Sequence, residues 1–226
     1  MFETIQVNYD STNNINKADT WLRFLDTKPL IACDFETALK YTPEELAYYK
    51  SVFNDPTSSK RDYRAAQAIL NATALDHPSH TVLTHLSVAW SDSDAYVFIL
   101  DNQRITKRIL YWLTHTLTTQ VWHNASYDFR QIHYRTGKFP LNYEDSQLKA
   151  KCILNHVETH KAKVGLKQLA GANYGDWGIS ADNFDVSQMY QPHVLKYAAT
   201  DACATYWLWN SINTYIQEQS CQTNVT

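Results

Sequence analysis

Short apolar runs alternate with amphipathic segments along this chain. Leu30-Ile31-Ala32-Cys33 follows Lys28-Pro29, and a short apolar run bounded in this way is typical of a buried strand. Three later segments have the same strand-like character, and polar turn residues separate the first two of them. These expected strands cover residues 81–90, 95–100 and 120–123.

Apolar spacings of three and four residues predict helices between these strands. Thr42-Pro43-Glu44-Glu45 is typical of a helix start, with Thr42 as the N-cap and proline in the first turn. Residues 1–16 are polar and rich in asparagine, so we expect a loose N-terminal segment there. The expected helices cover residues 19–25, 42–53, 61–75, 102–117, 125–135, 145–156, 164–170 and 194–217. This order of elements indicates an α/β fold with a mixed sheet flanked by helices.

Length and composition fit one soluble domain spanning residues 1–226, without a repeat or a linker. Hydrophobic residues make up 44% and charged residues 19% of the chain. A net charge of −3 excludes a strongly basic nucleic-acid coat but leaves room for a local basic groove. The four scattered cysteines indicate free thiols in a reducing compartment. We therefore expect a cytoplasmic protein, in the host cytoplasm if it is viral, with no membrane partner.

Two carboxylates follow the first expected strand directly, in the segment Asp34-Phe35-Glu36-Thr37. Side chains alternate along a strand, so Asp34 and Glu36 point to the same face. Bringing two like charges together is costly unless a cation lies between them. Magnesium and similar hard cations take carboxylate oxygens as ligands, so the pair predicts a divalent metal site.

Two further acidic positions are partners for this pair. Asn124 and Asp128 lie where the strand at 120–123 gives way to a helix, and Tyr197 and Asp201 share one face of the last helix. Taken singly, Asn124 is as easily an N-cap, Asp128 a first-turn acid favoured by the helix dipole, and Asp201 a solvent-facing residue. Their order along the chain is what makes them informative.

The combination D-x-E, N-x-x-x-D and Y-x-x-x-D resembles the DEDD superfamily of 3′→5′ exonucleases, which have an RNase H-like fold. The resemblance covers roughly residues 28 to 210. Tyr197 places it closest to the tyrosine subgroup, since the sister subgroup has a histidine where this chain has Lys196. Asp145-Ser146-Gln147-Leu148 and the stretch at 165–170 resemble elements of the proofreading domains of family A DNA polymerases.

The resemblance implies two divalent ions, Mg²⁺ or Mn²⁺, and a role for each motif residue. Asp34 would bridge both ions, Glu36 and Asp201 would complete the shell of the first, and Asp128 would hold the second through water. Tyr197 would orient the attacking water.

The remaining candidates concern substrate binding. Phe35, Trp122 and Tyr127 beside the motifs offer rings for stacking single-stranded bases. Thr37 and Asn124 complete the expected contacts to the substrate, with a helix cap as the alternative for Asn124. His160 and Lys167 belong to a basic cluster that meets phosphates or else forms a solvated face.

Residues 38–80 depart from the family, because a helical pair interrupts the path from the first strand to the second. We expect this insertion beside the active site, where it gates the 3′ end, docks a partner or is a neutral surface feature. The leading interpretation is an exonuclease on the 3′ end of single-stranded DNA, acting in proofreading or end trimming, with a separate DNA polymerase subunit as a possible partner. An RNase D-like exoribonuclease and a non-catalytic scaffold are the alternatives.

Overall fold

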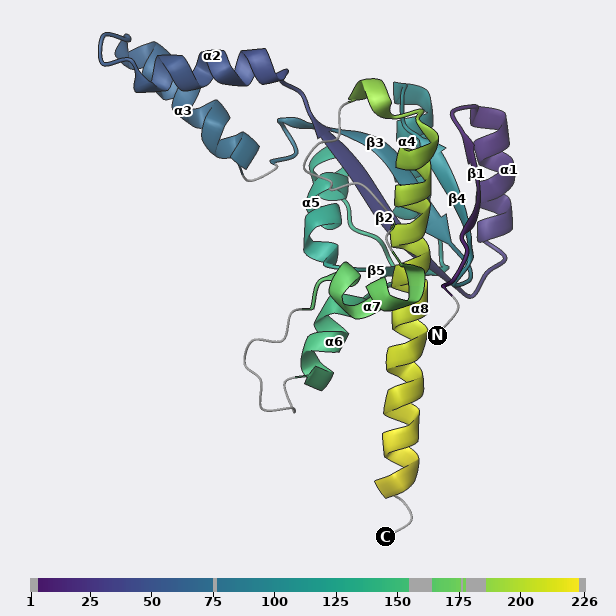
Figure 1. The fold of residues 1–226 in the computed structure, drawn as a ribbon. Coiled ribbons are helices and arrows are strands. Elements are labelled where there is room, and N and C mark those ends of the chain that lie inside the picture. The colour runs from purple at the N-terminus through teal and green to yellow at the C-terminus, as the bar shows by residue number, and fades with distance from the viewer. Residues whose placement is uncertain (1–3, 75–76, 155–163, 176, 178–185, 224–226) are drawn as a thin grey trace.

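Six strands form one mixed sheet in the computed structural model, which describes residues 4–74, 77–154, 164–175, 177 and 186–223 (Figure 1). The strand order is β1-β4-β3-β2-β5-β6, with β2 antiparallel to β3 and parallel to β5. The predicted mixed sheet is therefore confirmed. The strands are β1 (Asn8–Thr12), β2 (Leu30–Leu39), β3 (Thr81–Ala89), β4 (Asp94–Ile99), β5 (Thr119–Trp122) and β6 (Tyr143–Asp145).

Helices cover both faces of this sheet. The α-helices are α1 (Ile15–Leu25), α2 (Pro43–Asn54), α3 (Lys60–Ala74), α4 (Gln103–Leu113), α5 (Ala125–Thr136), α6 (Ser146–Leu154), α7 (Leu166–Tyr174) and α8 (Pro192–Thr223), and Val186–Gln188 forms a 3₁₀ turn, η2. No helix of the described ranges is both long and apolar enough to cross a bilayer.

The alternation along β2 divides the core into two layers. Ile31, Cys33 and Phe35 pack with α1, α4 and α5 on one face of the sheet. Ala32 faces the other layer, where the buried Ala198 and Ala202 let α8 approach closely. Asp34 and Glu36 continue the series of Ala32, so their side chains lie on the face that α8 covers.

Three expectations about the sheet were wrong or incomplete. Residues 8–12 are not part of a loose N-terminal segment, because they pair in parallel with β4 as an edge strand. β2 continues to Leu39, six residues past the apolar run that predicted it, and a register shift interrupts its pairing with β3 between Glu36 and Thr37. The short strand β6 at the other edge carries no apolar alternation and went unpredicted.

The predicted pair of helices after the strand that carries Asp34 and Glu36 is confirmed, as α2 and α3 (Figure 1). Thr42 caps α2 as predicted, since its hydroxyl accepts from the Glu45 N–H while the Glu45 carboxylate accepts from the Thr42 N–H. The two helices pack chiefly on each other and project from the end of β2. We call residues 43–74 the arm.

Candidate active site

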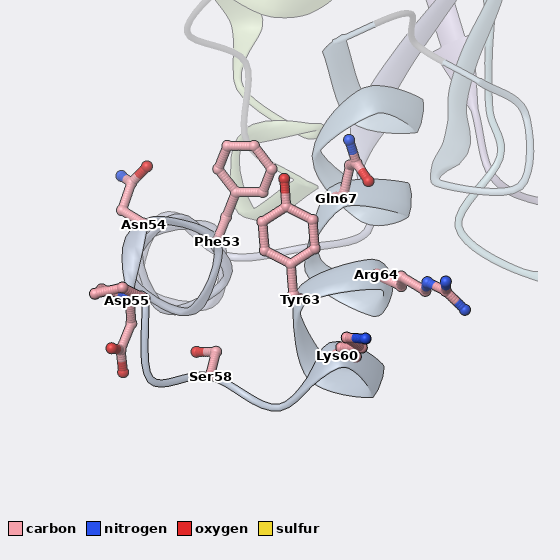
Figure 2. Close-up of a pocket in the computed structure, with 9 residues that line it drawn as sticks. Phe53, Asn54, Asp55, Ser58, Lys60, Tyr63, Arg64 and Gln67 are labelled. Atoms are coloured by element: carbon pink, nitrogen blue, oxygen red, sulfur yellow. The ribbon is translucent and has the colours of Figure 1, made fainter.

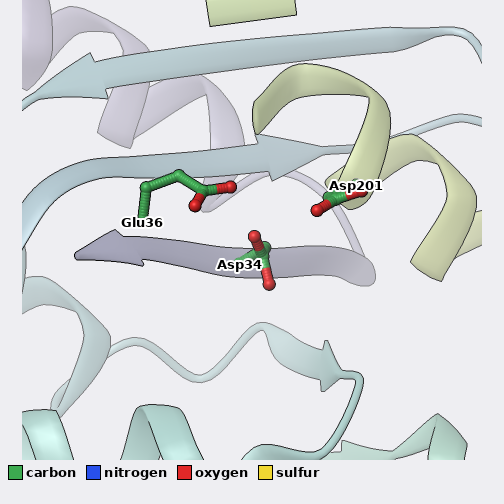
Figure 3. A group of neighbouring side chains, drawn as sticks. All are labelled: Asp34, Glu36 and Asp201. Carbon is green, nitrogen blue, oxygen red and sulfur yellow. The ribbon is translucent and has the colours of Figure 1, made fainter. Parts of the chain in front are cut away.

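Three carboxylates meet where β2 and α8 cross (Figure 3). Asp34 and Glu36 come from one face of β2, and Asp201 comes from the α8 turn above them. One oxygen of each lies within 4.8 Å of the others, which is close enough for one cation to contact all three. Asp34 and Glu36 are half-buried while Asp201 is buried, so the group is open to solvent on one side.

Asp128 approaches the same strand from its other edge. β5 pairs only with Leu30 to Ala32 of β2, which leaves the later N–H groups of that edge without a strand partner. The Phe35 N–H donates to Asp128 Oδ1 across 3.3 Å, so the first turn of α5 takes the place of the missing strand. Asp128 is buried, and its charge acts on both Asp34 and Glu36.

Burial and mutual repulsion both oppose the ionisation of these carboxylates. Burial raises the pKa of Asp34 and Glu36 well above the usual range, and the neighbouring carboxylates raise it further. Burial likewise raises the pKa of Asp128 to about 8 and that of Asp201 to about 6. Glu36 Oε1 and Asp201 Oδ1 are buried and have no hydrogen-bond partner among the described residues.

Aromatic and basic side chains surround Asp201. Burial and the nearby carboxylates raise the pKa of the Tyr197 hydroxyl, which hydrogen-bonds to Asp201 one helical turn away. The Lys167 ammonium of α7 lies 4.5 Å from the Tyr197 ring centre and lowers the pKa of both Asp201 and Glu36. Trp177 is buried beside Asp201 and also favours the ionised carboxylate. No sequence pattern pointed to Trp177.

Asn124 does not cap α5 with its side chain, so this part of the prediction was wrong. Its backbone takes the left-handed conformation (φ 64°), which asparagine tolerates better than most residues, and its side chain makes no capping bond. Asp145 caps the helix instead, accepting from the Asn124 and Ala125 N–H groups at 3.3 and 3.0 Å. A contact between the exposed Asn124 and substrate stays a prediction.

The expected stacking rings differ in exposure. Phe35 and Trp122 lie in the core on the far face of the sheet, 4% and 0% exposed, so base stacking on either ring was a wrong prediction. The Tyr127 ring is half-buried and its hydroxyl hydrogen-bonds to the Thr37 hydroxyl, so both residues stay candidates. Lys167 lies against the site, and His160 lies outside the described residues.

Comparisons with known proteins find structural similarity only. No protein-family model and no curated protein matches the chain. The Nibbler EXO domain of Aedes aegypti superposes with a TM-score of 0.64 at 12% identity, over 96% of this chain and 93% of that one. NrnC of Brucella melitensis matches with bound Mg²⁺ (TM-score 0.55, 15% identity, 96% and 84%) and bound to pGG (0.56, 15%, 96% and 83%).

Escherichia coli RNase D, described as an exoribonuclease involved in structured RNA processing, gives a TM-score of 0.57 at 14% identity. The match covers 95% of this chain but 46% of the RNase D chain. The TM-scores show a shared fold, and at such low identities they show the fold alone, so the predicted RNase H-like α/β architecture is confirmed.

Proposed function

We propose that this protein is a metal-dependent 3′→5′ exonuclease of the DEDD type. The observation that carries the proposal is the group Asp34, Glu36 and Asp201, whose oxygens lie within 4.8 Å of one another. A purely structural role does not explain three carboxylates in contact, because mutual repulsion destabilises the fold. The proteins with the same fold include an exoribonuclease and an Mg²⁺ complex, which supports the assignment.

The donor set fits Mg²⁺ or Mn²⁺. All candidate ligands are carboxylate oxygens, which hard cations prefer. The buried oxygens Glu36 Oε1 and Asp201 Oδ1 have no hydrogen-bond partner in the described chain, and a cation would satisfy both. Asp34, Glu36 and Asp201 would hold the first ion, and Asp128 would help to hold a second. When bound, the ions lower the pKa of water and stabilise the leaving 3′-oxygen.

The protein's own groups position the reactants. The Tyr197 hydroxyl keeps its proton at neutral pH because its pKa is raised above 10, so it acts as a hydrogen-bond donor and not as a base. Its bond to Asp201 aims it at the carboxylate group, where it would orient the attacking water. Thr37 and Tyr127 would contact the terminal nucleotide, and the Lys167 ammonium would attract phosphate.

RNA is the better-supported substrate. Escherichia coli RNase D, which shares the fold, is an exoribonuclease, and this favours RNA over the DNA substrate that the sequence predicted. The DNA prediction rested on the resemblance of two stretches to polymerase proofreading domains, and both have a structural explanation. Asp145 caps two helices, and Gln168 Oε1 accepts from the Gly165 N–H at the start of α7.

A paired degradation assay tests the proposal. Single-stranded RNA and the matching DNA, each labelled at the 5′ end, are incubated with Mg²⁺ and with wild type, Asp34→Asn or Asp10→Asn. Asp10 lies exposed on β1 and provides a control for the same substitution away from the site. We expect a 3′→5′ ladder on RNA that Asp34→Asn abolishes and Asp10→Asn preserves.

A ladder on DNA alone would restore the proofreading hypothesis and its polymerase partner. If the protein binds Mg²⁺ but produces no ladder on the RNA or on the DNA, the non-catalytic scaffold would be the favoured function.

A further inference from the structure

Most side chains of the arm are exposed. Within its described side chains only Ala66 is buried, while Tyr48 is 63% and Tyr63 38% exposed. Helices of 12 and 15 residues are marginally stable in water without a packing partner. The exposed faces of α2 and α3 are therefore available to bind another molecule.

A hollow of about 520 Å³ opens at the tip of the arm, between the end of α2 and the start of α3 (Figure 2). Phe53 of α2 stacks on Tyr63 of α3, with ring centres 5.0 Å apart and planes 18° apart. Lys60, Tyr63, Arg64 and Gln67 line the hollow at spacings of three and four, so one face of α3 combines a ring with two cations and an amide.

Acidic and basic side chains at the tip differ in their contacts. Asp55 accepts from the N–H and hydroxyl of Thr57, and Asp62 accepts from the Ser59 hydroxyl. These carboxylates are thus engaged in capping the loop and the helix start. In contrast, neither Lys60 nor Arg64 forms an ion pair within the described residues, so both cations are available to an anionic partner.

An exposed tyrosine ring beside unpaired cations favours single-stranded nucleic acid, which offers base faces for stacking and phosphates for the cations. The arm follows β2, the strand that carries Asp34 and Glu36. The 12 residues of α2 make a helix about 18 Å long, which separates the tip of the arm from the end of β2. A strand whose 3′ end lies at the carboxylates can therefore reach the tip only with nucleotides well upstream of that end.

We propose that the tip of the arm binds the substrate strand several nucleotides 5′ of the end held at the carboxylates. The inference rests on the proposed exonuclease function and adds a second contact to it. Long strands would be held at both places, whereas a dinucleotide would be held at the carboxylates alone. The arm would thereby give the enzyme a preference for longer single strands.

The test compares the charge reversal Lys60→Glu/Arg64→Glu with the matched reversal Arg104→Glu/Lys107→Glu on exposed positions of α4. Binding of a labelled single-stranded RNA of about 20 nucleotides is followed by fluorescence anisotropy in EDTA, which prevents metal-dependent turnover. Hydrolysis of the same RNA and of a dinucleotide is then measured with Mg²⁺. Circular dichroism checks that both variants keep their helices.

We expect the arm variant to bind the long RNA about tenfold more weakly, with a salt dependence reduced by a slope of about 1.4, since each lost phosphate contact removes about 0.7. The arm variant should hydrolyse the dinucleotide as wild type does. The α4 variant should match wild type in binding the long RNA and in hydrolysing the dinucleotide. Equal losses on both substrates, or unchanged binding of the long RNA, would overturn the proposal.

Arm-dependent self-association in sedimentation with unchanged RNA binding would assign the arm to a second copy of this chain, and would also overturn the proposal. If wild type hydrolyses neither substrate but binds the long RNA through the arm, the exonuclease function fails while the arm contact stands.

Discussion

The backbone N–H of Phe35 donates to Oδ1 of Asp128 across 3.3 Å and links two segments 93 positions apart in the chain. The bond fixes the first turn of α5 against the open edge of β2. It also brings the Asp128 charge to the same strand that carries Asp34 and Glu36 on its α8 face. The distance between the two parts of the candidate metal site is therefore set by a backbone contact in the middle of the D-x-E motif.

The pKa of Asp128 predicts how stability depends on pH without metal. Its pKa is about 8 in the fold and about 3.9 in an unfolded chain, so the folded state binds the proton more tightly. This contribution is fully present below pH 4 and is lost as the pH rises through about 8. We expect the free energy of unfolding in EDTA to fall between pH 5 and 8, as measured by urea denaturation.

Asp128→Asn is the matched variant, because its amide oxygen still accepts from the Phe35 N–H but does not ionise. Its free energy of unfolding should change less over the same pH range, and should exceed that of wild type at pH 8. Parallel pH profiles for the two proteins would contradict the assignment of this dependence to Asp128.

Asp201→Asn should separate stability from activity. Removing one of three adjacent carboxylates relieves repulsion, so we expect a higher melting temperature in EDTA together with at least a 100-fold loss of nuclease activity. Mg²⁺ should stabilise wild type by about 2.7 kcal/mol at 100 times its dissociation constant and stabilise the variant much less. Differential scanning fluorimetry with a Mg²⁺ titration measures both effects, with Asp10→Asn as control.

An equal Mg²⁺ shift in Asp201→Asn and wild type would place the ion elsewhere in the protein.

Tyr197→Phe removes one hydroxyl and keeps the ring over which Lys167 lies. We expect kcat to fall about 10- to 100-fold with KM changed little, because the lost hydrogen bond orients water without holding the substrate. The raised pKa of Tyr197 further predicts that its ionisation is absent from the wild-type pH–rate profile below pH 10. Tyr215→Phe, on an exposed turn of α8, is the control.

Unchanged kcat in Tyr197→Phe would leave the tyrosine with a packing role only.

The apolar run at residues 30–33 predicted the strand, although not its continuation to Leu39, and side-chain alternation placed Asp34 and Glu36 on one face of it. The long helix that carries Asp201 was also predicted. The same alternation places Phe35 on the opposite face of β2, so its burial was predictable, and the expectation of stacking overlooked it. The edge strand at residues 8–12 could not be found in this way, because polar residues form it and its partner β4 lies more than 80 positions away. Capping of α5 by Asp145 also depends on long-range placement, because Asp145 lies 20 positions from Ala125.

One carboxylate fixes the start of two helices, and its removal should therefore cost more than an ordinary cap. Asp145 accepts from Asn124 and Ala125 at the start of α5 and from Gln147 and Leu148 at the start of α6. Loss of one cap costs about 0.5–2 kcal/mol, so we expect Asp145→Ala to lower the free energy of unfolding by about 1–4 kcal/mol in urea denaturation.

Asp145→Asn should cost less than Asp145→Ala, since asparagine also caps helices well but offers one acceptor oxygen where aspartate offers two. Glu144→Ala, at the exposed neighbouring position, is the control and should stay within about 0.5 kcal/mol of wild type. Because α5 carries Asp128, Asp145→Ala should also lower nuclease activity, and this loss should be partly reversed by excess Mg²⁺. A cost no greater than that of Glu144→Ala would show that water replaces the carboxylate at both helix starts.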